Sequence, residues 1–199
     1  MNNKKHSVFW YFGVVFVALV LFSVFINIGN SSKTTTSSKE LTSNNQQSSR
    51  RIWKLGYFVD DFGDYTKDKY LKTSNQYGSF SNSATTNSNL KWNLLVTRQY
   101  IAFFLYEYGS SQVKGFSSFP DTYKVSIKED NGAITSFDAK NGSDRIMISN
   151  SSDYQKFLAI LNKEREVKIS IQETGLAASS SYNLGVLDCA GFGAEFKEL

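Results

Sequence analysis

Apolar and polar residues alternate along most of the chain after residue 51, and the period is two. In "VKISIQ", for example, Val167, Ile169 and Ile171 fall on one face and polar residues on the other. This alternation is typical of a β-strand with one buried face. The segments "YKVSIKED", "AITSFDAK" and "DRIMISN" follow one another, with Asn-Gly pairs at 131–132 and 141–142 between them. Asn-Gly is the usual signal of a two-residue hairpin, so we expect a meander of three strands.

Five further segments have the composition of strands. Two of them, "KWNLLVTR" and "YIAFFLYEY", are apolar on both faces, as expected for strands at the centre of a packed sheet. The others are "RIWKLGYFV", the segment "YLKTSN" with "YGSFSN", and "SYNLGVL". We expect eight or nine strands and therefore a mainly β fold, either a β-sandwich or a partly open barrel.

One segment, residues 151–164, has the period of a helix instead. Its apolar residues recur at i, i+3, i+4 and i+7 and form one stripe, made of Tyr154, Phe157, Leu158 and Leu161. Ser152, with Gln155 three residues later, predicts a capping box at the start of this helix, and Asp153 suits the positive end of its dipole. The β-domain is therefore expected to carry one amphipathic helix. The final "DCAGFGAEFKEL" is compatible with a second, short helix.

The N-terminal part is different, because "VFWYFGVVFVALVLFSVFI", residues 8–26, contains no charge. These 19 residues would form a helix of roughly 28 Å, which matches the apolar core of a bilayer. We predict a transmembrane helix over residues 8–28. Lys4 and Lys5 precede it directly, whereas the first basic residue after it is Lys33, so the N-terminus is expected in the cytoplasm. The alternative is a cleaved signal peptide, which would make the protein secreted.

This pattern divides the chain into four parts. Residues 1–7 are a cytoplasmic stub and residues 8–28 the membrane helix. Residues 29–50 are almost wholly Ser, Thr, Asn, Gln and charged, and are expected to form a disordered linker. Residues 51–199 form the β-domain, which this orientation places outside the cytoplasm, at the inner or plasma membrane.

The distribution of charge argues against binding to nucleic acid. The chain has 22 basic and 18 acidic residues, of which five basic and one acidic residue precede Arg51. The β-domain therefore has 17 of each, and it contains no basic run of the kind that phosphate backbones require.

Histidine and cysteine usage restricts the possible chemistry further. His6 is the only histidine and precedes the β-domain, which excludes a Ser-His, Cys-His or His-ligated zinc site there. Cys189 is the only cysteine, so the domain has no internal disulfide, and we expect Cys189 to pack as a small apolar residue. On these grounds we expect the protein not to be an enzyme and to need no cofactor.

One stretch, "VDDFGDYTKDKY" at residues 59–70, gathers acidic residues. It does not follow the EF-hand pattern of oxygen ligands with glycine at position 6. Asp60, Asp61 and Asp64 are still candidates for an irregular calcium site, and a hydrolase that uses carboxylates or calcium at this loop is an alternative function. The other interpretation is a turn centred on Gly63, with its acids in solvent and paired to Lys67 and Lys69.

Some of these segments also carry a resemblance. "WKLGYFVDDFGDYTKDKYL", followed by "GSFSNSAT", resembles the opening of uncharacterised bacterial envelope proteins that have an anchor or an export signal. The order of "YKVSIKED", "SDRIMIS", "YQKFLAILNKEREVKISI" and "YNLGVLDCAGF" resembles extracytoplasmic β-domains of invasion-associated and type VI secretion accessory proteins. Those accessory domains often carry paired cysteines, which this chain lacks. The resemblance implies an exported β-sandwich and brings no catalytic residues with it.

Together these features predict a membrane-tethered binding or scaffolding module of the bacterial cell envelope. Its ligand is not defined by the sequence, and the expected partners are the membrane through residues 8–28 and an envelope protein or glycan. Homo-oligomers could form through the membrane helix or through an exposed strand edge.

Overall fold

The computed structural model describes residues 52–113, 122–174 and 180–199. The predicted stub, membrane helix and linker at 1–7, 8–28 and 29–50 lie outside the described residues. Within the described ranges, no helix is both long and apolar enough to span a bilayer.

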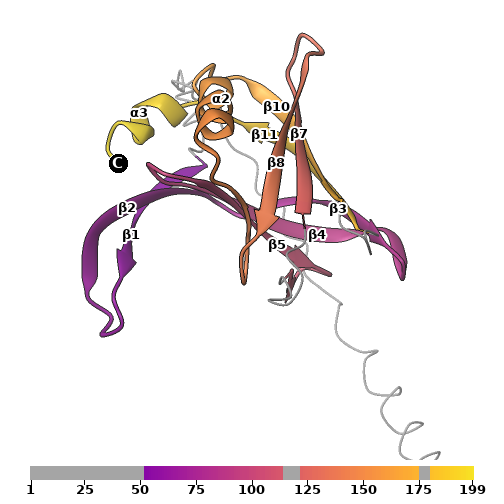
Figure 1. Ribbon diagram of the computed structural model, residues 1–199, viewed down its shortest axis with the longest axis horizontal. Coiled ribbons are helices and arrows are strands. Elements are labelled where there is room, and N and C mark those ends of the chain that lie inside the picture. Colours follow the sequence, from indigo (N-terminus) through magenta and orange to yellow (C-terminus); the bar gives the residue numbers. More distant parts are fainter. Residues whose placement is uncertain (1–51, 114–121, 175–179) are drawn as a thin grey trace, which may run out of the picture. The chain divides into compact units, whose positions relative to one another are not determined.

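The described part contains eleven strands and two helices, and it is mainly β as predicted (Figure 1). The strands are β1 (Trp53–Val59), β2 (Tyr65–Thr73), β3 (Gln76–Asn82), β4 (Thr85–Val96), β5 (Ile101–Glu107), β6 (Ser111–Gln112), β7 (Thr122–Lys128), β8 (Ile134–Asn141), β9 (Ile146–Ile148), β10 (Glu166–Glu173) and β11 (Ser181–Asp188). The helices are α2 (Ser151–Leu161) and α3 (Phe192–Phe196).

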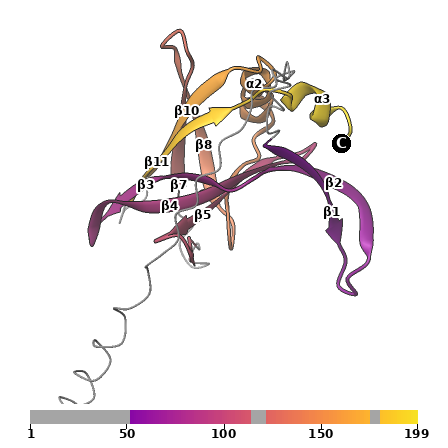
Figure 2. The same ribbon diagram turned by 180° about the vertical axis from the view of Figure 1, so that it is seen from behind.

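Eight of these strands close into a barrel. The strand order β4-β3-β11-β10-β7-β8-β9-β5 returns to β4, because β4 pairs with β3 along one edge and with β5 along the other. Of the two predicted architectures the barrel is the one present, and its ring is closed rather than partly open. The 12 residues of β4 let one of its edges hold β3, at Thr85–Trp92, and the end of β2, at Leu95 and Val96, while the other edge holds β5. β1 and β2 form a hairpin that lies outside the ring, paired to β4 through Leu71 and Lys72 (Figures 1 and 2).

Alternation along the strands fills the barrel with apolar side chains. In β10, Val167, Ile169 and Ile171 are buried, while the residues between them are exposed, as predicted. Trp92 of β4 is completely buried, and its Nε1 donates a hydrogen bond of 3.0 Å to the carbonyl oxygen of Leu184 in β11. This bond satisfies the one polar atom of a large core side chain.

β4 and β5 are apolar on both faces for a reason that the sequence did not show. Their outward residues Leu95, Ala102 and Phe104 form a second buried cluster, against which Tyr70 of β2 packs. The hairpin outside the ring thus covers part of the barrel's outer face.

Helix α2 packs its predicted stripe onto the barrel core. The ring of Phe157 lies 6.0 Å from Phe103 and 5.2 Å from Phe137, measured between centroids. The predicted capping box at Ser152 and Gln155 is wrong, because the N-cap residue is Asn150. Its side chain accepts hydrogen bonds from the backbone N–H groups of Ser152 and Asp153, two and three residues further on.

The predicted meander is confirmed as β7-β8-β9. Its first turn is longer than the expected two-residue hairpin. Glu129 N–H donates to Ala133 O, and Gly132 N–H donates to Glu129 O, with Gly132 in the left-handed region at φ +85°. This is a three-residue loop that ends in a glycine bulge, the other common use of Asn-Gly between strands.

Cys189 is buried at 0% exposure, as predicted. Burial raises the pKa of its thiol to about 12, and the nearby charge of Asp188 contributes to the same shift. The thiolate is the reactive form, so a buried thiol that stays protonated reacts slowly.

We therefore expect the folded chain not to react with a thiol reagent such as DTNB at pH 8, and one equivalent to react in denaturant. A variant with an added exposed cysteine, Ile134→Cys, should react with one equivalent when folded. Rapid reaction of the unmodified folded chain would contradict the buried position of Cys189.

Candidate functional site: a row of small polar residues on the barrel

The outer face of the barrel carries a row of small polar side chains that crosses six strands. Each residue of the row is the direct cross-strand partner of the next. In order from β8 through β7, β10, β11 and β3 to β4, the serine row consists of Ser136, Ser126, Ser170, Asn183, Ser79 and Asn89. All six residues are exposed or half-buried.

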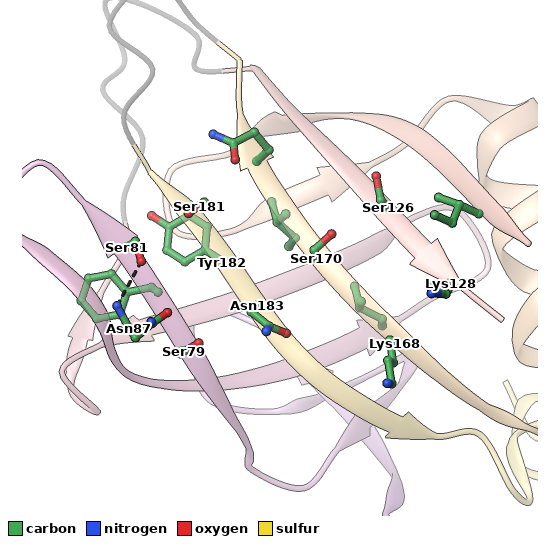
Figure 3. A pocket seen from close by; sticks show the side chains of 15 residues that line it. Ser79, Ser81, Asn87, Ser126, Lys128, Lys168, Ser170, Ser181, Tyr182 and Asn183 are labelled. Carbon is green, nitrogen blue, oxygen red and sulfur yellow. Dashed lines mark hydrogen bonds between the residues drawn. The ribbon is translucent and has the colours of Figure 1, made fainter. Parts of the chain in front are cut away.

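Four residues of the serine row, Ser79, Asn183, Ser170 and Ser126, line a depression of about 390 Å³ over β3, β11, β10 and β7 (Figure 3). Ser136 and Asn89 continue the row beyond it on either side. Longer side chains stand in the adjacent rows. Lys128 and Lys168 face each other on one side, and Lys124 and Gln172 face each other on the other. Serine is short, so the row is lower than its neighbours and leaves a groove across the strands.

A β-bulge in β11 shapes the middle of the groove. The register shifts between Ile169 and Ser170 of β10, where Gly185 has φ +76°. The Asn183 side chain accepts a hydrogen bond of 3.1 Å from the N–H of Gly185, which fixes the amide at the groove. The carbonyl next to the bulge, that of Leu184, is the one held by buried Trp92. A bulge of this kind bends the strand and redirects its side chains.

The neighbouring strand must come unusually close at this place. A Cβ atom added to Gly78 of β3 would lie 2.2 Å from the carbonyl oxygen of Asn183. Only glycine permits this approach, so Gly78 keeps β3 and β11 together beneath the groove.

The groove offers hydroxyl and amide groups rather than acids. The Ser126 and Ser136 hydroxyls lie 2.9 Å apart, and Ser81 Oγ accepts a bond of 3.0 Å from the Asn87 N–H (Figure 3). Each hydroxyl can both donate and accept a hydrogen bond. A row of hydroxyls can therefore bind a ligand whose own groups also donate and accept hydrogen bonds.

Beneath the groove, Tyr182 is buried and donates to Glu107 Oε1 at 3.1 Å. Burial raises the pKa of Tyr182 strongly, and the charge of Glu107 adds to that shift. The phenol therefore stays neutral at physiological pH and serves as part of the floor.

One side of the groove is positively charged. Lys128 and Lys168 are direct cross-strand partners, both exposed. The acids next in sequence to Lys128 are held by other cations, since Glu129 pairs with Lys163 and Asp130 with Arg165. Among the described residues, no ion pair involves either lysine of the groove, so both charges face solvent or a ligand.

The acidic stretch of the sequence lies elsewhere, at the tip of the β1–β2 hairpin. Asp60, Asp61 and Asp64 are all exposed there. Asp60 Oδ1 accepts hydrogen bonds from Phe62 N–H at 2.9 Å and from Asp64 N–H at 3.0 Å, and Gly63 has φ +88°. The turn centred on Gly63 is thus present, with one of its acids used to close it.

The expected ion pair between these acids and Lys69 is wrong. The Lys69 ammonium group donates to the carbonyl oxygen of Glu198 at 2.8 Å and lies 5.7 Å from the ring centroid of Tyr57. In the part of the chain that the structure describes, no three or more His, Cys, Asp or Glu side chains are grouped so as to hold a metal ion. The calcium site at Asp60, Asp61 and Asp64 stays a prediction.

Sequence reasoning missed the serine row, although part of its signal was present. Ser126, Ser136, Ser170 and Asn183 all fall on the polar face of their alternating strands. Their alignment depends on the register between strands, which a single strand's pattern does not contain.

Comparison of the chain with protein-family models, with curated proteins and with solved structures finds no match. The resemblance to bacterial envelope proteins stays a prediction.

Because a Cβ at Gly78 would overlap a backbone oxygen, Gly78→Ala should lower the free energy of unfolding by about 1–3 kcal/mol. Thermal or urea unfolding measures this change. Ser79→Ala, the next residue, has an outward side chain and is the matched control, with an expected change below about 0.5 kcal/mol. Equal effects of the two substitutions would contradict the close approach of β3 and β11.

Asp60→Ala should destabilise the chain by about 1 kcal/mol, because two backbone N–H groups lose their acceptor. Asp60→Asn keeps an oxygen at Oδ1 and should leave the free energy of unfolding nearly unchanged, as should Asp61→Ala.

Thermal unfolding with millimolar calcium and with chelator tests the metal prediction separately. A calcium-dependent rise in Tm that Asp64→Ala abolishes would support a metal site, and an unchanged Tm would count against it.

Proposed function

We propose that this protein is a non-enzymatic binding module of the bacterial cell envelope, tethered to the membrane by residues 8–28. Its ligand is an anionic glycan that lies along the serine row. The observation that carries this proposal is the alignment of six small polar residues in one register across six strands, with two lysines beside it.

The length of the serine row favours a polymer over a small molecule. The depression spans four neighbouring strands of the row, which at roughly 4.8 Å spacing is about 14 Å along the sheet. A compact metabolite would occupy only part of this length, whereas a chain of a few sugar units would fill it. The groove is open, which suits a ligand that extends beyond it in both directions.

The chemistry of the groove favours sugar hydroxyls and an acidic group. Serine hydroxyls and the Asn183 amide both donate and accept hydrogen bonds, as the hydroxyls of a glycan do. Lys128 and Lys168 suit a carboxylate or phosphate, as compact positive charges with several donors each. Tyr77 points to the same side of β3 as Ser79 and is 73% exposed, so its ring is available to pack against the face of a sugar.

The direct test is binding of the full-length chain, in detergent micelles, to polygalacturonate and to neutral dextran. The polyuronate should bind more tightly than dextran, because only the polyuronate has carboxylates for the two lysines. The double variant Lys128→Gln and Lys168→Gln should weaken polyuronate binding at least tenfold, which interferometry or calorimetry can measure. Ser170→Leu, which fills the middle of the groove, should weaken binding of both polymers.

The matched control is Lys140→Gln with Lys156→Gln. These lysines are also exposed, on β8 and α2, and they lie away from the residues that line the groove. These two substitutions together should change the affinity for the polyuronate less than twofold. Equal losses in the two double variants would indicate general attraction of charge, and absence of binding to either polymer would contradict the proposed ligand class.

A further inference from the structure

The exposed large hydrophobic side chains of the described chain are concentrated on the β1–β2 hairpin. Of the nine large hydrophobic side chains that are most exposed among the described residues, five belong to this hairpin: Leu55, Tyr57, Val59, Phe62 and Tyr65. Phe62 at the tip is 92% exposed. Clusters of this kind in soluble domains usually mark an interaction site.

The outer edge of β1 is also open to a further strand. In the described part of the chain, β1 pairs with β2 alone. Its sequence, "WKLGYFV", has no proline and is rich in residues that favour strands. Natural proteins usually protect such an edge with charges, proline or a covering segment, because its backbone groups are a template for pairing.

The backbone of β1 fixes which residues can pair across this edge. Ser74 N–H donates to Ile52 O, and Asp60 N–H donates to Asp64 O, so even-numbered residues direct their backbone groups to β2. Because these directions alternate along a strand, Trp53, Leu55, Tyr57 and Val59 direct theirs to the open edge.

We propose that β1 of a second copy of this chain occupies that edge, antiparallel and centred on Tyr57. This register joins odd-numbered residues, Tyr57 with Tyr57 of the second copy and Leu55 with its Val59, so the backbone groups match. It also joins Lys54 with Asp60 and Gly56 with Phe58. The self-complementary pairing brings the exposed apolar side chains of the two β1 strands side by side and places opposite charges together.

The pairing also resolves a conflict within one chain. Lys54 and Lys72 are direct cross-strand partners, so two like charges face each other on the hairpin. Asp60 of the second copy brings a carboxylate next to Lys54. Its own turn uses only Oδ1 of that carboxylate, which leaves Oδ2 for the second chain. The serine row has no residue in β1 or β2, so this contact does not use the proposed ligand site.

Disulfide formation in the full-length chain in membranes tests the contact. Tyr57→Cys should give a cross-linked dimer on mild oxidation, because the two Cα atoms of such a strand pair lie about 5.5 Å apart. The native Cys189 is buried and gives no background. Ile134→Cys, an exposed strand residue at 65%, is the matched control and should give at least fivefold less dimer.

Mixing differently tagged copies tests the register. Leu55→Cys should cross-link with Val59→Cys of another chain, and at least fivefold more than with a second Leu55→Cys chain. Equal yields for all pairs, or no dimer with Tyr57→Cys beyond the control, would overturn the proposal.

Lys54→Glu separates the dimer contact from the stability of the fold. The introduced carboxylate would face Lys72 within its own chain and Asp60 of the second copy across the dimer. Combined with Tyr57→Cys, the substitution should raise Tm and reduce cross-linking at least threefold. Undiminished cross-linking would overturn the proposed register.

Discussion

Closure of the ring through β4 is the constraint on which the rest of this structure depends. β4 is 12 residues long and pairs with β3 on one edge and β5 on the other, so the eight strands form a continuous ring. A closed sheet buries its inward side chains, and a single core results. The registers of all eight strands are then linked, which allows side chains on distant segments to form one continuous row around the barrel.

The proposed ligand site and the proposed dimer contact both follow from this closure. The bulge at Gly185 and the close approach at Gly78 bend β11 against β3 while the ring stays closed, and the serine row crosses that bend. β1 and β2 are excluded from the ring, because β4 already has a partner on each side over most of its length. They therefore keep an open strand edge beside an apolar face, which is where we place the second copy.

Much of the fold could be predicted from local pattern, whereas most of the site could not. A period of two identified β7 to β10, apolar residues on both faces identified β4 and β5, and the helical stripe identified α2. The lack of a second cysteine led to the expectation that Cys189 packs as a small apolar residue. Closure could not be predicted, since alternation says which face is buried but not which strand lies beside which. The cap at Asn150 was missed because several residue types compete for that position. The acidic residues at 60–64 are the most conspicuous cluster in the sequence, yet Asp60 closes a turn. The groove is built from serines, and a single serine on a strand does not indicate a site.

Hydrogen exchange of the backbone amides, followed by mass spectrometry on the full-length chain, tests the closed ring most directly. If β4 holds both neighbours, peptides from β3, β4, β5 and β11 should exchange together and only through global unfolding, with the β1–β2 hairpin exchanging sooner. Exchange of β3 or β5 at the rate of the loops, while the rest of the sheet stays protected, would show an open sheet. That result would contradict the continuous register of the serine row and the function proposed for it.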